Sequence, residues 1–146
     1  MTPEQLASVR ATAVLVERAI DQCASCFYDD LFDRHPSTRR LFADDVMSAG
    51  ATLLDELLGL IAATDDLGAF LLQARALGLR LQRRGIHAAD YAFVGDALIA
   101  AIEAVVGDTW TVDVEAAWRR MYALVVEAML EGAEEGLFRS SERREA

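Results

Sequence analysis

Apolar residues recur every three or four positions along nearly the whole chain, which is the spacing of a helix with one buried face. The opening stretch Thr2-Pro3-Glu4-Gln5 fits a helix start, because it combines a threonine cap, a proline in the first turn and a glutamine three residues after the cap. The apolar face continues to Phe32 with a break near residues 19–21. We therefore expect two consecutive helices, and His35-Pro36 should end the second because the residue before a proline disfavours helical backbone.

The same periodicity continues to the end of the chain. Further apolar stripes span residues 36–42, 46–61, 70–81, 91–105 and 114–137. Gly85 fits the position just past a helix end, Gly107 breaks the next helix, and either Thr111 or Asp113 can cap the last one. Because no segment alternates as a strand does, the predicted fold class is all-α with about seven helices.

The chain length of 146 residues fits one domain, and 53% of the residues are apolar. We expect this domain to cover residues 1–138, followed by a polar tail at residues 139–146 that should fray. The formal net charge of −10 argues against nucleic acid and against anionic membranes as partners, since both attract clustered Lys and Arg.

Localisation is predicted to be cytoplasmic. We expect no signal peptide at the start of the chain, because Glu17 and Arg18 interrupt the first apolar run. No stretch reaches the roughly 18 apolar residues that span a bilayer. Two cysteines, Cys23 and Cys26, suit a reducing compartment.

Few residues carry obvious chemistry. Cys23 and Cys26 lie one helical turn apart and are interpreted as small core or boundary residues, with a redox sensor as the alternative. A zinc site would need both cysteines and both histidines, His35 and His87, to converge. The sequence contains no glycine-rich phosphate loop and no GxSxG motif, so catalysis is not indicated, although the question of an enzyme stays open.

A series of short motifs resembles the single-domain bacterial haemoglobins and the globin half of flavohaemoglobins. The resemblance covers residue 2 to about residue 138 and implies a globin fold, a three-over-three helical sandwich. The motifs that carry it, in order, are Phe27-Tyr-Asp-Asp-Leu-Phe32, His35-Pro36, Arg39-Arg-Leu-Phe42, Gly85-Ile86, Tyr91-Ala-Phe-Val-Gly95, Val106-Gly-Asp108 and Ala117-Trp-Arg-Arg-Met-Tyr122.

The resemblance also implies a haem pocket with assigned positions. Tyr28 matches the distal tyrosine that hydrogen-bonds iron-bound oxygen, Phe42 matches the phenylalanine that stacks on haem, and Tyr91 matches a tyrosine on the proximal side. The distal glutamine position falls on Ala49, and Leu53 is a further pocket position.

The proximal histidine position of the family falls on Leu81. Leu81 stands four residues before Gly85 and three residues after Gly78, and the family pattern agrees on both sides. The family's glutamate on the last helix falls on Ala133, or on Glu134 if the register moves by one. Leucine has no lone pair for iron, so conventional haem ligation is not expected.

Three functional hypotheses follow from this resemblance. The first is a sensory or binding globin-fold domain with an apolar small molecule in the former haem pocket. The alternative is a globin that binds haem b through unusual ligation, by Tyr28 or His87 rather than His35, and thereby oxygen or nitric oxide. The third is an interaction module that forms a homodimer. Flavohaemoglobins oxidise nitric oxide with an attached reductase, and no such module is expected in this chain.

Overall fold

The computed structural model describes the backbone of residues 1–42 and 52–145, and the side chains of residues 1–42 and 53–136. Every regular element within these ranges is a helix, which confirms the all-α fold class. The α-helices and the short 3-10 helices (η) are, in order, α1 (Pro3–Arg18), α2 (Ile20–Arg34), η1 (Pro36–Leu41), α4 (Thr52–Ala62), η2 (Ala63–Asp65), α5 (Leu67–Arg83), α6 (Asp90–Val106), η3 (Gly107–Thr109) and α7 (Val112–Glu145).

Local chemistry sets the first helix boundaries as the sequence predicts. The hydroxyl of Thr2 accepts from the backbone N–H of Gln5 at 3.1 Å, and the Gln5 side chain accepts from the backbone N–H of Thr2 at 3.0 Å. The predicted break falls at Ala19, between α1 and α2. The short helix after Pro36 is a 3-10 helix, and the first part of the stripe predicted from Val46 lies outside the described residues.

Two later caps refine the predicted boundaries. Asp66 follows η2 and caps α5, because its carboxylate accepts from the backbone N–H of Ala69 at 3.1 Å. Thr111 caps α7 by accepting from the backbone N–H of Val114 at 3.2 Å. The sequence offered Thr111 and Asp113 as candidate caps of this helix, and Thr111 is the residue that caps it.

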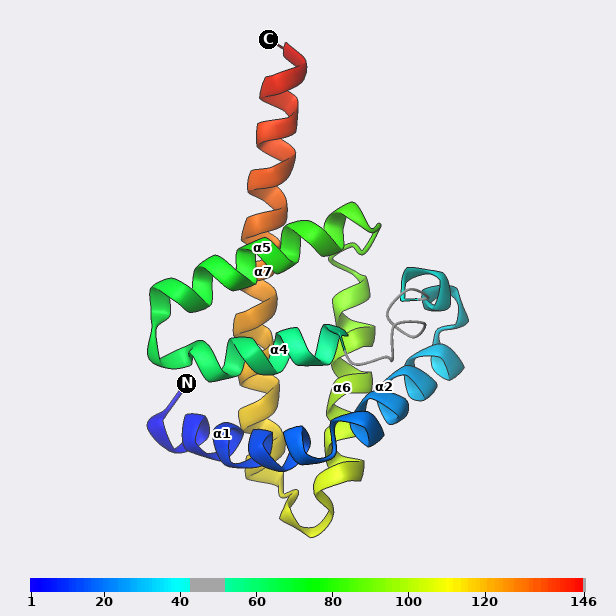
Figure 1. Cartoon of the computed structure of the whole chain (residues 1–146), viewed down its shortest axis with the longest axis vertical. Coiled ribbons are helices and arrows are strands. Elements are labelled where there is room, and N and C mark those ends of the chain that lie inside the picture. Colours follow the sequence, from blue (N-terminus) through cyan, green and yellow to red (C-terminus); the bar gives the residue numbers. More distant parts are fainter. Residues whose placement is uncertain (43–51, 146) are drawn as a thin grey trace.

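The last helix is longer than expected. The backbone of α7 is helical over 34 residues, as far as Glu145, so helical backbone continues into the segment that the sequence analysis assigned to a polar tail. Figure 1 shows that the C-terminal part of α7 projects past α5. The division into a globin domain and a separate tail stays a prediction. No helix in the described part of the chain combines the length and the apolar character that crossing a bilayer needs.

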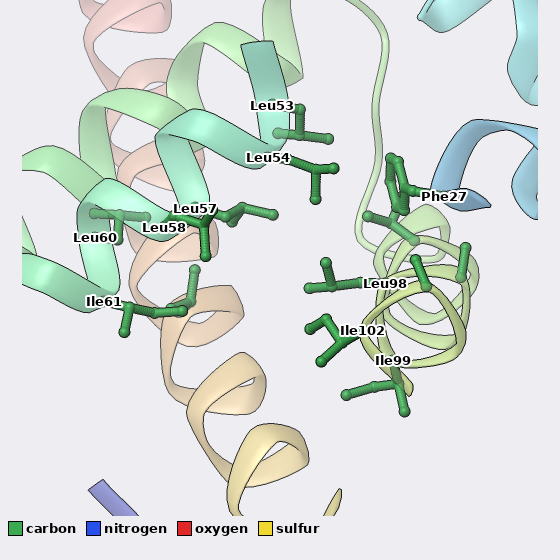
Figure 2. Packing of buried hydrophobic residues seen from close by; sticks show 14 of the residues in the cluster. Phe27, Leu53, Leu54, Leu57, Leu58, Leu60, Ile61, Leu98, Ile99 and Ile102 are labelled. Carbon is green, nitrogen blue, oxygen red and sulfur yellow. The ribbon is translucent and has the colours of Figure 1, made fainter. Parts of the chain in front are cut away.

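The helices pack in crossed layers around α7. In Figure 1, α4 and α5 run across α7, while α6 runs alongside it and α2 packs against α6. Figure 2 shows leucines of α4 on one side of the core and α6 side chains with Phe27 of α2 on the other. The largest fully buried side chains include Trp118, Phe27, Phe42, Leu31, Leu54, Leu60, Ile102 and Met129.

Candidate functional site

The C-terminal end of α5 fixes the position of Leu81. Gly85 has a φ of 99°, a left-handed conformation that suits glycine just past a helix end. The backbone N–H of Gly85 donates to the Gln82 carbonyl at 3.0 Å, and that of Ile86 donates to the Leu81 carbonyl at 3.0 Å. This pair of bonds is a Schellman motif, in which the residue after the glycine packs against the residue at the position of Leu81. The side chains of Leu81 and Ile86 are accordingly buried.

Leu81 and Ile86 line a small cavity that is bounded by α4, α5, α6 and α7. The cavity measures about 10 Å³, which is space for about one water molecule. Four positions that the resemblance assigned to a haem pocket meet in its wall, namely Phe42, Leu53, Leu81 and Tyr91. The complete lining is Phe42, Leu53, Leu57, Leu81, Ile86, Tyr91, Val94, Tyr122 and Met129.

The polar groups in this wall are two tyrosines. The Tyr122 hydroxyl donates to the Tyr91 carbonyl oxygen at 2.6 Å, and its ring lies so close to Gly95 that a Cβ there would be 2.5 Å from Cε1. Burial raises the pKa of Tyr122 well above its ordinary value of 10.0, with smaller contributions from Tyr91 and Asp96. Burial also raises the pKa of Tyr91, with a smaller contribution from Asp90. Both phenols are therefore uncharged at neutral pH, and the cavity wall carries no charge.

Tyr28 lies beside this cavity but does not line it. Its side chain is 5% exposed and packs in an aromatic cluster on α2 and the segment that follows η1. Its ring centroid lies 4.9 Å from that of Phe27, 5.7 Å from that of Phe32 and 6.0 Å from that of Phe42. Phe42, which Tyr28 contacts, does line the cavity.

The two histidines lie away from the cavity. His87 is exposed before α6, and its backbone N–H donates to the Asp90 carboxylate at 2.8 Å. His35 is half-buried and stacks on Phe93, with ring centroids 3.9 Å apart. Ala49, the position matched to the distal glutamine, lies outside the described residues.

No carboxylate reaches this cavity from the described residues. Ala133 is half-buried, Glu134 is exposed, and neither lines the cavity, so the family's proximal glutamate has no counterpart in its wall. Five lining residues were not predicted as site residues: Leu57, Ile86, Val94, Tyr122 and Met129. All but Ile86 follow from the apolar stripes as core residues, and the motif after Gly85 places Ile86 next to the helix end.

The cysteines match their interpretation as core and boundary residues. Cys23 is buried, Cys26 is half-buried, and both are free thiols. Burial raises the pKa of the Cys23 thiol to about 12, with a smaller contribution from Cys26, so this thiol is protonated at neutral pH and is a poor nucleophile. Within the described ranges, no group of three or more His, Cys, Asp or Glu side chains is placed to hold a metal ion.

Larger hollows lie elsewhere on the surface. One of about 720 Å³ opens between α2, η1 and α6 and is lined by aspartates of α2 and alanines of α6. Another of about 350 Å³ lies between the start of α1, the start of α5 and α7, with mostly apolar walls. Neither shares a lining residue with the small cavity at Leu81, so both are separate from the site that the resemblance indicates.

The cavity that Leu81 lines among the described residues has no space for a haem. A cofactor pocket of this kind needs roughly 300–1,000 Å³, whereas the cavity among the described residues measures about 10 Å³. Haem iron also needs a protein ligand with a lone pair, and Leu81 offers none. One of the two polar side chains in the wall, the Tyr122 hydroxyl, already donates to the backbone carbonyl of Tyr91.

Comparison with known proteins identifies the family to which this chain is related. The globin family pattern matches residues 25–129. The chain is 24% identical over 139 residues to the flavohaemoprotein of Bacillus subtilis, which covers 93% of this chain and 35% of that protein. It is 26% identical over 149 residues to the flavohaemoprotein of Bordetella pertussis, with coverage of 99% and 37%. The chain thus spans about a third of the length of these relatives.

A solved structure supports the fold. The crystal structure of a hexacoordinated haem protein from an anhydrobiotic tardigrade superimposes with a TM-score of 0.83, covering 92% of this chain and 96% of that chain. The two sequences are 15% identical, so this likeness concerns the arrangement of the helices. The family match extends over well more than half of the chain. This chain belongs to the globin family.

Proposed function

We propose that this chain is a non-haem globin domain with a sensory or binding role. The observation that carries the proposal is Leu81, a buried hydrocarbon side chain in the cavity wall beside Phe42 and Tyr91. The resemblance assigns this position to the histidine that holds haem iron. A globin without that nitrogen has to hold haem through another ligand, or through apolar contact and propionate pairing alone. The cavity among the described residues gives a haem no space for such contact.

The cavity wall supports an apolar molecule as the ligand. Seven of the lining side chains are hydrocarbon, thioether or phenyl groups, and the phenols of Tyr91 and Tyr122 are uncharged. A charged ligand would lose its hydration here without gaining a partner of opposite charge. Because the cavity holds about one water molecule, a larger ligand has to move side chains or helices as it enters. Such a ligand favours the opened conformation, which is the basis of a sensor.

The visible absorption spectrum tests the proposal. The purified protein should lack a Soret band, and titration with hemin should give no saturable band near one haem per chain. A control titration with a haem-binding globin sets the expected amplitude. A strong Soret band at one haem per chain in the protein as purified would overturn the proposal.

The alternative is a globin that holds haem through a tyrosine or a surface histidine and thereby binds oxygen or nitric oxide. Tyr28 favours it, since its buried ring lies next to Phe42, the residue matched to haem stacking. This alternative requires the cavity to open widely. If hemin does bind, Tyr28→Phe and His87→Ala separate the two ligands, because loss of the ligand shifts the Soret band. An unchanged spectrum in both variants excludes both residues as ligands.

A further inference from the structure

A groove with apolar walls lies between the start of α1, the start of α5 and the first half of α7, and both helix starts lie on the same side of α7 in Figure 1. Its volume is about 350 Å³, and it is lined by Met1, Thr2, Pro3, Leu6, Thr64, Leu67, Phe70, Met121 and Leu124. Phe70 and Met121 are buried and form its floor, whereas Leu67 is 68% exposed and forms part of its rim. The groove therefore offers an apolar floor that solvent can reach.

The two polar side chains in the wall already have hydrogen-bond partners. The Thr2 hydroxyl accepts from the backbone N–H of Gln5 at 3.1 Å. The Thr64 hydroxyl donates to the Ile61 carbonyl at 2.7 Å and accepts from the Arg10 guanidinium at 2.8 Å. A ligand that competes for these groups has to break an existing bond for each one it forms, so its main attraction to the groove is apolar contact.

The walls of the groove carry no charged side chain among the residues that line it. Arg10, which contacts Thr64 from outside the groove, forms an ion pair with Asp65. A charged group placed on the apolar floor would lose its hydration without gaining a partner of opposite charge. The part of a ligand that lies in the groove is therefore uncharged.

The size of the groove fits a small molecule better than a protein. Its volume of about 350 Å³ falls within the roughly 300–1,000 Å³ of small-molecule pockets. Nine residues line it, whereas a stable protein partner needs about 20–30 residues on each side. The groove alone is thus too small to hold a folded partner.

We propose that this groove binds an uncharged aliphatic molecule, whose chain lies on Phe70 and Met121 and whose polar end stays in the solvent. The site is distinct from the cavity at Leu81, because the two share no lining residue. The groove already has the volume for a ligand, whereas the cavity of about 10 Å³ has to open before one enters. The inference goes beyond the proposed function, since it gives the domain a second place for an apolar molecule.

Methyl NMR of the full chain, with octanol as the probe, tests the position of the site. The methyl signals of Leu6, Leu67 and Leu124 should shift saturably, whereas those of Leu72, which does not line the groove, should stay in place. Shifts confined to Leu81 and its neighbours would put the alcohol in the other cavity. That result, or the absence of a shift at all of these leucines, would overturn the inference.

Leu67→Asn and Leu72→Asn form a matched pair of variants on α5. The two leucines are 68% and 72% exposed, so both variants should fold with a stability close to that of the wild-type protein. Leu67→Asn should weaken octanol binding by about threefold or more, because the rim loses apolar contact, and Leu72→Asn should leave it unchanged. Equal octanol affinities of the two variants would contradict the proposed site.

A short series of ligands tests the chemical class. Hexanol should bind about tenfold more weakly than octanol, because it buries two fewer CH₂ groups. Octanoate and octylammonium should bind no more tightly than octanol, because the walls hold no charged side chain to pair with them. Tighter binding of either ion, or equal binding of the two alcohols, would overturn the assignment to an uncharged aliphatic molecule.

Light scattering of the same two variants tests a second copy of the chain as the occupant. The groove should play no part in self-association, so a wild-type dimer that Leu67→Asn dissociates and Leu72→Asn does not would overturn the inference. Hemin keeps the two proposals apart. Hemin uptake by the wild-type protein defeats the proposed function and leaves the groove untouched, whereas no uptake together with no octanol binding defeats only the groove.

Discussion

The indole N–H of Trp118 donates to the hydroxyl oxygen of Thr12 at 2.7 Å and thereby joins α7 to α1. Both side chains are 2% exposed, so neither polar group can turn to water instead. The Thr12 hydroxyl in turn donates to the carbonyl of Ser8 at 2.8 Å within its own helix. A buried donor that loses its acceptor costs more than the bond itself contributes, so this pair is a sensitive point of the fold.

The first prediction concerns Thr12→Val, which keeps the shape of the side chain and removes the acceptor for Trp118. The free energy of unfolding should fall by about 1–3 kcal/mol, because the indole N–H is then buried without a partner. Urea denaturation followed by tryptophan fluorescence measures it. Thr12→Ser keeps the hydroxyl and removes only the methyl group, so a loss of equal size in Thr12→Ser would show that the site responds to any change of side chain rather than to the missing acceptor.

The second prediction concerns the cavity. Leu81→Ala should lower the free energy of unfolding by about 2–5 kcal/mol, because truncating this buried leucine leaves a cavity in the core. The enlarged apolar cavity should bind benzene, so benzene should raise the stability of Leu81→Ala but not that of the wild-type protein. Urea midpoints with and without benzene measure both effects.

Leu72→Ala provides the control on the same helix. Leu72 is 72% exposed, so its removal should change the stability by less than about 0.5 kcal/mol and create no benzene site. Similar decreases in the free energy of unfolding for Leu81→Ala and Leu72→Ala would contradict the position of Leu81 in a packed cavity wall.

The third prediction concerns pH and Cys23, whose thiol pKa burial raises from 9.0 to about 12. Between these values the unfolded chain has lost the proton that the folded protein keeps, so stability falls as pH rises from about 9 to 12 and is unaffected below that window. The fall in the free energy of unfolding is about 1.4 kcal/mol per pH unit within this window. Cys23→Ala should lose this slope.

The measurement is the urea midpoint as a function of pH, compared between variants. Tyr91 and Tyr122 also keep their protons longer in the folded state, so they add a further fall above pH 10 that all variants share. Cys26→Ala retains the burial of Cys23, which is the larger cause of its raised pKa, and should keep most of the fall in stability. A Cys23→Ala profile parallel to that of the wild-type protein would show that burial does not retain this proton.

Helix boundaries could be predicted because they depend on local chemistry. The Thr2 cap involves a residue three positions away, and the left-handed Gly85 depends on its own backbone. The place of Leu81 in a buried wall also follows from local spacing, since Gly85 fixes the helix end four residues later. These features need no knowledge of which helices touch.

The size of the cavity could not be predicted, because it depends on contacts between distant segments. The bond from Tyr122 to Tyr91 joins residues 31 positions apart, and the contact of Gly78 with Met129 joins two different helices. The sequence did carry one signal for the second contact. Gly78 and Gly132 lie inside helices, where glycine is unfavourable unless another backbone comes close.

The last prediction concerns Leu81→His, which supplies the missing nitrogen without supplying space. From the sequence alone, this variant should bind haem if the register is right. The cavity of about 10 Å³ changes the expected outcome, because a porphyrin cannot enter between Leu57, Met129 and the residue at position 81. Hemin titration of Leu81→His should therefore give no Soret band at one haem per chain.

Leu81→Gln separates ligation from the burial of a polar group, since its side chain is also polar but carries no imidazole. Both variants should be less stable than the wild-type protein, because a polar group enters an apolar wall. A stoichiometric Soret band in Leu81→His, absent in Leu81→Gln, would show that the residues lining the cavity can move apart far enough to admit a haem. Position 81 would then be the proximal position, and the missing nitrogen alone would keep haem out of the wild-type protein.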